Sequence, residues 1–312
     1  MSYAFHTADV FTDVAFGGNQ LAVLPDARGL SSGQMAQIAR EFNFSETIFV
    51  FPPEDPANTR RVRIFTPGAE LAFAGHPTVG AAYVLALTGE ISLDGDETRI
   101  VLEEGAGPVP VLIRSREGKP YFTQLTAPKI PELVRNDFDA EIIARGLSLG
   151  TGDLDLDNGK SIEVVSAGVP FLIVPLKTVE TLGRARLDQQ AWEAVVRSGG
   201  TTEVFIFTED ESSKARDGVR DGDGMVRARM FAPSFGIPED PATGGACACL
   251  GGYLAWRSAR TDGTLRYAVT QGIEMGRPSL LEIETDIEHG RVTQVRVGGA
   301  SVLMTTGTLH MP

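Results

Sequence analysis

The sequence predicts an α+β protein of two similar halves, each built from several strands packed on one long apolar helix. Four segments recur in one order along the chain, and in each copy strands precede an apolar helix instead of alternating with helices. We expect a cleft between the halves, lined by residues that differ: Glu46 corresponds to Thr202 and His76 to Asp240. The recurring segments are 20–25 and 170–175, 45–51 and 201–207, 62–67 and 228–233, and 76–82 and 240–246.

In the first half a helix is predicted over 32–42, because its apolar residues recur at the i, i+3, i+4, i+7 spacing of one helix face. Ser31 or Ser32 supplies its N-cap. A second helix is predicted over 79–87, an apolar run with Pro77 near its first turn. Strands rich in β-branched and aromatic residues are predicted at 3–11, 21–24, 47–51, 61–65, 98–102 and 109–114.

The second half repeats this order, with a helix over 188–197 and an apolar helix from about Thr243 to 256. Pro128 interrupts the pattern between the halves. We therefore expect domains at 1–127 and 128–312, the C-terminal segment of which can pack back on the first half. Strands are predicted at 171–174, 204–207 and 226–231.

The composition excludes several classes of protein. With 312 residues, 42% of them hydrophobic and 22% charged, the chain has room for two folded domains. No apolar run reaches the roughly 20 residues of a membrane span, and the N-terminus lacks the features of a signal peptide, which predicts a cytoplasmic protein. A net charge of −13 argues against nucleic acid as a partner. Cys247 and Cys249 are spaced for neither a disulfide nor a zinc site, so we expect buried, reduced thiols.

Two motifs are better explained by chance or by solvation. The G-x-S-x-G at 146–150 would need a strand before it, and a helix-like run precedes it instead. The Asp-, Gly- and Ser-rich stretch 209–224 predicts an exposed loop between strands. Its Asp217, Asp221 and Asp223 do not form an EF-hand, because position 228 is alanine where that loop needs glutamate.

Two loop–helix junctions carry glycines, at 75–80 and at 243–246. The start of a helix presents unpaired N–H groups and the positive end of its dipole, which together bind anions. Two such junctions facing one cleft could hold a carboxylate substrate without arginine or lysine. The alternative is that the small residues serve only the packing of helix on sheet.

Three polar residues have settings that suit proton transfer. Glu46 lies beside apolar Phe44 and Ile48, and a carboxyl group in an apolar cleft would have a raised pKa. His76 and Asp240, each followed by proline, lie at the mouths of the two junctions. An exposed glutamate at the start of a strand remains the alternative for Glu46.

Four segments occur in order along nearly the whole chain: D-V-F-T-D-V-A-F-G-G-N-Q-L-A-V at 9–23, F-N-F-S-E-T-I-F-V at 42–50, F-A-G-H-P-T-V-G-A-A at 73–82 and E-D-P-A-T-G-G-A at 239–246. Together they resemble the PhzF-like phenazine-biosynthesis family. The resemblance implies a diaminopimelate-epimerase-like fold, in which each pseudo-symmetric half is a β-barrel-like sheet wrapped around a central α-helix. It also implies a cofactor-free isomerase, without metal, that acts as a homodimer.

The family's residues transfer to this chain position by position. Its acid/base glutamate falls on Glu46, its assisting histidine on His76 and its aspartate on Asp240. The family's namesake activity isomerises trans-2,3-dihydro-3-hydroxyanthranilate by moving a proton from C3 toward C1. We therefore expect general acid/base isomerisation of a small cyclic or unsaturated carboxylate. The predicted substrate-binding residues are Asn19, Ser45, Gly75, Thr243, Gly244 and Gly245.

Two positions depart from the family pattern. Gly245 stands where the second loop commonly has a serine that lies at the substrate in the phenazine enzyme. Gln20 stands where the first loop usually has proline. The first departure weakens the case for an identical substrate.

Two alternatives remain open, an epimerase that uses a carboxylate and a non-catalytic binding protein on the same scaffold. Racemisation by two thiols is excluded, because the first half contains no cysteine and Ala74 stands where such a thiol is expected. One principal acid/base and an unequal supporting pair favour a directed proton shift.

Overall fold

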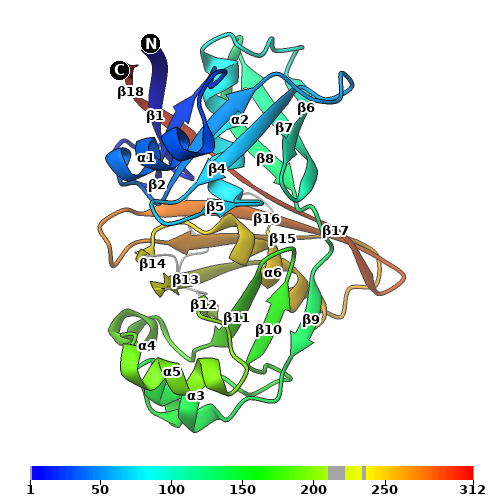
Figure 1. Cartoon of the computed structure of the whole chain (residues 1–312). Helices are drawn as coiled ribbons and strands as arrows, with labels where there is room; N and C mark the ends of the chain where they lie inside the picture. Colours follow the sequence, from blue (N-terminus) through cyan, green and yellow to red (C-terminus); the bar gives the residue numbers. More distant parts are fainter. Residues whose placement is uncertain (1, 210–221, 234–236, 312) are drawn as a thin grey trace. The chain divides into compact units, whose positions relative to one another are not determined.

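The computed structural model describes residues 2–209, 222–233 and 237–311 (Figure 1). The chain divides into two compact units. Unit 1 comprises Met1–Pro128, Arg277–Leu280 and Arg296–Pro312, and unit 2 comprises Lys129–Gly276 and Leu281–Val295. Both units combine strands with a few helices, which confirms the predicted α+β class.

Unit 1 is organised around one buried helix, α2 (Gly75–Leu87), which is apolar on all sides and contacts strands β1, β2, β3, β7 and β8 (Figure 1). A helix without a polar face must be enclosed, and here the strands enclose it. The amphipathic α1 begins at the predicted residue, with Ser31 and Gln34 forming a capping box. The elements are β1 (Ser2–Val10), β2 (Asn19–Leu24), α1 (Ser32–Phe42), β3 (Glu46–Phe51), β4 (Arg60–Phe65), β5 (Glu70–Leu71), α2, β6 (Glu97–Glu104), β7 (Gly107–Arg116), β8 (Lys119–Thr126) and β18 (Ser301–His310).

Unit 2 is organised around a second buried helix, α6 (Gly244–Ala255), which contacts β10, β11 and β15 (Figure 1). The elements before α6 are β9 (Glu132–Arg135), α3 (Ala140–Gly146), η1 (Thr151–Asp153), β10 (Glu163–Ser166), β11 (Pro170–Pro175), α4 (Val179–Arg184), α5 (Gln189–Arg197), β12 (Val204–Glu209), β13 (Gly224–Ala232) and β14 (Ile237–Asp240). After it come β15 (Gly263–Gln271), β16 (Ser279–Glu288) and β17 (Arg291–Gly299), of which residues 279–280 and 296–299 belong to unit 1.

Unit 2 contains the G-x-S-x-G motif and the predicted exposed loop at 209–224. Helix α3 precedes 146–150, so the G-x-S-x-G motif does not follow a strand and is no nucleophile elbow. Most of the predicted loop at 209–224, with Asp217 and Asp221, lies outside the described residues.

The pairing of strands repeats from unit to unit. In unit 1, β2 is parallel to β3, β3 is antiparallel to β4, and β4 pairs antiparallel with β5 and parallel with β6. In unit 2, β11 is parallel to β12, β12 is antiparallel to β13, and β13 pairs antiparallel with β14 and parallel with β15. The two halves are therefore built on one plan.

The registers correct the predicted correspondence of Glu46 with Thr202. Thr47 pairs with Phe65 in unit 1, and Val204 pairs with the equivalent Phe231 in unit 2. The β2–β3 and β11–β12 pairings give the same alignment of β3 with β12. In this alignment Glu46 corresponds to Glu203. Both strands are buried on both faces, so no alternation of apolar and polar residues distinguishes one register from the next.

The correspondence of His76 with Asp240 is also wrong. Asp240 pairs with Met230, and its counterpart in the β4–β5 pair is Leu71, which pairs with Ile64. Helices α2 and α6 each begin four residues after these positions, so His76 corresponds to Gly245. The predicted alignment matched His76 with Asp240 because each is followed by proline, but the two residues lie at different positions of the repeat.

Candidate active site

Three buried residues of unit 1 come together at the start of α2. Glu46 is the first residue of β3, Asn19 is the first residue of β2, and His76 lies in the first turn of α2. His76 Nε2 lies 3.4 Å from Glu46 Oε2, and His76 Nδ1 lies 3.2 Å from Asn19 Nδ2. Their exposed fractions are 1% for Asn19, 4% for His76 and 9% for Glu46. The parallel pairing of β2 with β3 brings the strand starts that carry Asn19 and Glu46 together, and the first turn of α2 adds His76.

His76 is a neutral imidazole at physiological pH. Burial lowers its pKa to about 3, against a smaller opposing contribution from a hydrogen bond with the backbone of Gln20. Its contact with Glu46 therefore joins a carboxyl group to an uncharged ring. A neutral imidazole holds a proton on one nitrogen and accepts at the other, as a relay requires.

The start of α2 contacts the buried carboxyl group of Glu104, which was not predicted from the sequence. Thr78 Oγ1 lies 2.6 Å from Glu104 Oε1 and 2.7 Å from the carbonyl oxygen of Ala74. Burial raises the pKa of Glu104 to about 8, while hydrogen bonds from Thr78 and Ala74 act in the opposite direction. The signal was available in the alternation along β6, where Glu104 follows Ile100 and Leu102 on the inward face.

A second group in unit 2 surrounds Asp240, at the end of β14. Thr243 Oγ1 donates to Asp240 Oδ2 at 2.5 Å. Gln271 binds both residues: its Nε2 donates to the carbonyl oxygen of Asp240 at 2.7 Å, and its Oε1 accepts from the Thr243 N–H at 3.1 Å. Gln271 was not predicted; it is buried at the end of β15, a strand of mixed apolar and polar residues.

The N-terminal turn of α6 presents the predicted glycines. Thr243 is its N-cap residue, Gly244 and Gly245 follow, and the first intrahelical bond runs from Cys247 N–H to the Thr243 carbonyl. The N–H groups of the first helical residues therefore have no acceptor within the helix, and they can bind an anion. A Cβ added at Gly245 would meet the Phe171 ring at 3.4 Å, an ordinary contact, so this position has room for a Cβ.

The thiols of unit 2 are not reactive. Cys247 and Cys249 are free and fully buried in α6, as predicted. Burial raises the pKa of Cys249 to about 12 and that of Cys247 further, so both remain protonated. The N-cap positions of α2 and α6 hold Ala74 and Thr243, so neither helix start carries a thiol.

The structure thus places the predicted residues in two groups, one in each unit. Asn19, Glu46, Gly75 and His76 belong to unit 1, where half-buried Ser45 directly precedes Glu46. Asp240, Thr243, Gly244 and Gly245 belong to unit 2. The missed counterpart of Glu46, Glu203, is buried and accepts a hydrogen bond from Thr202 Oγ1.

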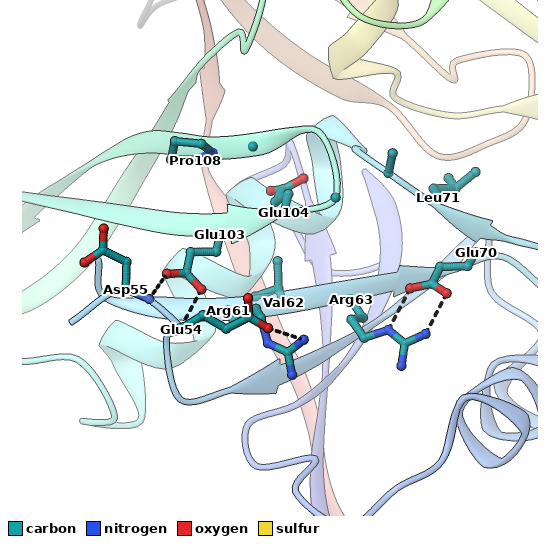
Figure 2. Close-up of a pocket in the computed structure, with 13 residues that line it drawn as sticks. Glu54, Asp55, Arg61, Val62, Arg63, Glu70, Leu71, Glu103, Glu104 and Pro108 are labelled. Atoms are coloured by element: carbon teal, nitrogen blue, oxygen red, sulfur yellow. Dashed lines mark hydrogen bonds and ion pairs between the residues drawn. The ribbon is translucent and has the colours of Figure 1, made fainter. Parts of the chain in front are cut away.

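Unit 1 also contains a pocket of about 700 Å³ between β4, β5 and the β6–β7 hairpin (Figure 2). Its lining includes Glu104, and it includes an ion pair between Arg63 and Glu70, but none of the predicted site residues.

Across residues 2–209, 222–233 and 237–311, no group of three His, Cys, Asp or Glu side chains is placed to hold a metal ion. In the same part of the chain no helix is long and apolar enough to cross a membrane.

Comparison with known proteins places these features in a family. A sequence model of the PhzC-PhzF family, described as phenazine biosynthesis-like protein, matches residues 8–307. An uncharacterized isomerase of Mesorhizobium japonicum is 36% identical over 306 residues, which cover 97% of each chain. The trans-2,3-dihydro-3-hydroxyanthranilate isomerase of Pseudomonas aeruginosa is 32% identical and covers 97% of this chain and 98% of its own. The crystal structure of a PhzF-family phenazine biosynthesis protein of Bacillus anthracis superimposes with a TM-score of 0.84 at 25% identity, covering 100% of both chains.

Proposed function

Since the chain belongs to the PhzC-PhzF family of phenazine biosynthesis-like proteins, whose relatives are named isomerases, we propose that it moves a proton on a small cyclic or unsaturated carboxylate without a cofactor. The single observation that carries this proposal is the buried contact between Glu46 and neutral His76. The named relative acts on trans-2,3-dihydro-3-hydroxyanthranilate, which makes that compound the first substrate to test.

In this proposal the Glu46 carboxylate takes a proton from a carbon of the substrate. The electron pair of the broken C–H bond moves into a new double bond, and the former double bond accepts the proton at another carbon. His76 orients Glu46 and relays the proton, while Asp240 assists from its own unit. N–H groups at the helix starts, at Gly75 and Gly244, hold the substrate carboxylate and the enolate-like charge that develops.

Replacing Glu46 by glutamine tests the proton transfer, because glutamine keeps the shape of the side chain and cannot carry the proton. We expect turnover of trans-2,3-dihydro-3-hydroxyanthranilate in deuterated water to fall by about 10²–10⁴-fold. The exposed Glu41→Gln, on α1 of the same unit, is the matched control and should retain wild-type turnover. Wild-type turnover by E46Q would show that the assignment is wrong.

One observation favours a second candidate, a carboxylate-dependent epimerase. Glu203 occupies the position in unit 2 that Glu46 occupies in unit 1, so each half carries a glutamate at this position. In a directed isomerase, deuterium enters one carbon with migration of a double bond, and Glu203→Gln leaves the rate unchanged. In a two-base epimerase, deuterium enters an α-carbon with loss of chirality, and E203Q blocks exchange from one enantiomer. A cytoplasmic location and a homodimer stay predictions.

A further inference from the structure

Each unit contains an arginine that binds a glutamate through two hydrogen bonds, and the two pairs stand at equivalent positions. In unit 2, Arg229 Nε and Nη2 donate to the two carboxylate oxygens of Glu239 at 2.8 and 2.9 Å. In unit 1, Arg63 donates in the same way to Glu70 at 2.7 and 2.6 Å (Figure 2). Each glutamate lies on the short strand that leads to the central helix, β14 or β5.

The two pairs share a further contact, which supports a common origin in the repeat. Each guanidinium lies over the ring of the phenylalanine two residues later. The distance from Cζ to the ring centroid is 4.9 Å for Arg229 and Phe231, and 5.2 Å for Arg63 and Phe65. What differs is the next residue of the short strand: Glu239 is followed by Asp240, and Glu70 is followed by Leu71.

The Arg229–Glu239 pair of unit 2 is more deeply buried than the Arg63–Glu70 pair of unit 1. Its arginine side chain is 3% exposed, compared with 24% for Arg63. Nη1 of Arg229 also donates to the carbonyl oxygens of Leu182 and Ala185, at 3.0 and 2.9 Å, at the C-terminal end of α4. A guanidinium that donates from all three of its nitrogens to carboxylate and carbonyl oxygens has little freedom to move, so Glu239 is tied to two elements at once.

Strand β14 depends on such a tie because its own ladder is short and irregular. Its register with β13 consists of Met230 with Asp240 and Ala232 with Ile237, with a shift between them. Adjacent residues of a strand point to opposite faces. Holding Glu239 on one face therefore sets the direction of Asp240 on the other, where it meets Thr243.

We propose that Arg229 and Glu239 are positioning residues that orient the Asp240 carboxylate. This inference rests on the proposed function, in which Asp240 acts on the substrate. The equivalent pair in unit 1 precedes an apolar leucine, so no reactive acid depends on it. The duplicated pair serves the fold in both units and serves the chemistry in one.

The central test replaces Arg229 by lysine, which keeps the charge and removes the fork that binds two oxygens. With trans-2,3-dihydro-3-hydroxyanthranilate as the probe, we expect R229K to lower kcat by about tenfold or more, because a small displacement of a catalytic group is costly. KM should change by less than about twofold. Arg63→Lys is the matched control and should keep kcat within about twofold of wild type.

A double-mutant cycle separates positioning from general support of the fold. We expect the loss caused by R229K to vanish when Asp240 is already asparagine, because nothing then remains to be positioned. An equal loss in both backgrounds would overturn the proposal. If R229K does not fold, Glu239→Gln replaces it in the cycle with the same expected results.

Hydrogen exchange distinguishes failure of this inference from failure of the proposed function. R229K should speed amide exchange in residues 237–243, and R63K should not. Faster exchange in R229K can be found together with a D240N variant as active as wild type, or with a wild-type protein that turns over neither the probe nor any of a panel of other small carboxylates. Either combination would reject the proposed function and leave the orienting role standing. Unchanged exchange at 237–243 in R229K would overturn the orienting role whatever the activity.

Discussion

At the scale of single residues, burial decides the charge that each candidate group carries. His76 and Glu104 lie close to the start of the same helix, and desolvation favours the uncharged form of both. For a histidine this lowers the pKa, and for a glutamate it raises the pKa. The start of α2 is therefore a low-charge environment beside Glu46, the residue to which we assign the proton transfer.

We predict that His76 does not titrate between pH 5 and 8. Its pKa of about 3 lies below its ordinary value of 6.5, so the ring is already neutral throughout this range. The ring resonances of His76, assigned in an NMR titration through His76→Gln, should keep constant shifts. A midpoint for His76 near 6.5 would contradict this assignment.

Glu104 should make the protein lose stability as pH rises. Its pKa of about 8 in the folded state exceeds the ordinary 4.5, so the folded state binds the proton more tightly. The resulting destabilisation is absent below about pH 4.5, grows as pH rises, and is complete above about pH 8. Urea unfolding of Glu104→Gln should therefore show a weaker fall in stability from pH 5 to 8 than wild type shows.

The control for Glu104 is its neighbour on β6. The pKa of Glu103 is lowered by hydrogen bonds from Asn58 and from the backbone of Glu54, so its contribution to pH dependence lies below its ordinary pKa. Glu103→Gln should leave the slope between pH 5 and 8 unchanged. Equal slopes for E104Q and wild type would show that Glu104 is not protonated in the folded state.

Gly245→Ser should fold normally and shift substrate preference. The added Cβ stands 3.4 Å from the Phe171 ring, which is an ordinary contact, and the helical backbone accepts serine. We expect G245S to keep the wild-type melting temperature and to raise kcat/KM for trans-2,3-dihydro-3-hydroxyanthranilate relative to a panel of other small carboxylates. An unchanged ratio would mean that position 245 does not select the substrate.

At the scale of elements, the two central helices owe their positions to close packing against strands. Gly80 of α2 faces Val10 and Leu21, where an added Cβ would come within 2.5 and 2.6 Å of their side chains. Gly251 of α6 is similarly crowded by Thr285 and Ile283. Small residues therefore allow each helix to approach its sheet closely enough to bring its first turn beside the strands that carry the acids.

We predict that Gly80→Ala destabilises the protein by about 1–3 kcal/mol, because overpacking forces neighbouring side chains to move. Gly152→Ala is the matched control, since a Cβ there meets nothing within 4 Å. Urea unfolding should show a change of less than about 0.5 kcal/mol for G152A. Equal stabilities of G80A and wild type would mean that α2 shifts to accept the methyl group.

The elements also show which sequence signals were reliable. Helix α1 and the body of α2 were predicted, because amphipathic spacing and a continuous apolar run are local features. The short strands β5 and β14 were not predicted, since two or four residues carry no periodicity. Each of these strands precedes a helix start that carries candidate residues. Because the two strands were not predicted, the residues before the two helices were aligned wrongly between the halves.

At the scale of the whole molecule, duplication produced two units with one plan and different residues at matched positions. Glu46 has Glu203 as its counterpart, but His76 has Gly245 and Asp240 has Leu71. The difference between the halves therefore does not lie in the presence of a glutamate. It lies in the groups supplied beside each helix start, a histidine in one unit and an aspartate in the other.

The sequence by itself determined the α+β class, the repeat, the buried helices and the family, because each of these is written in local composition or in an ordered set of motifs. Only the tertiary structure decided the register of the repeat, the contact between His76 and Glu46, the hydrogen bond between Thr78 and Glu104, and the buried partner Gln271. The physical reason is that strands buried on both faces show no alternation from which a register can be read. Pairing across distant parts of the chain then sets which side chains meet.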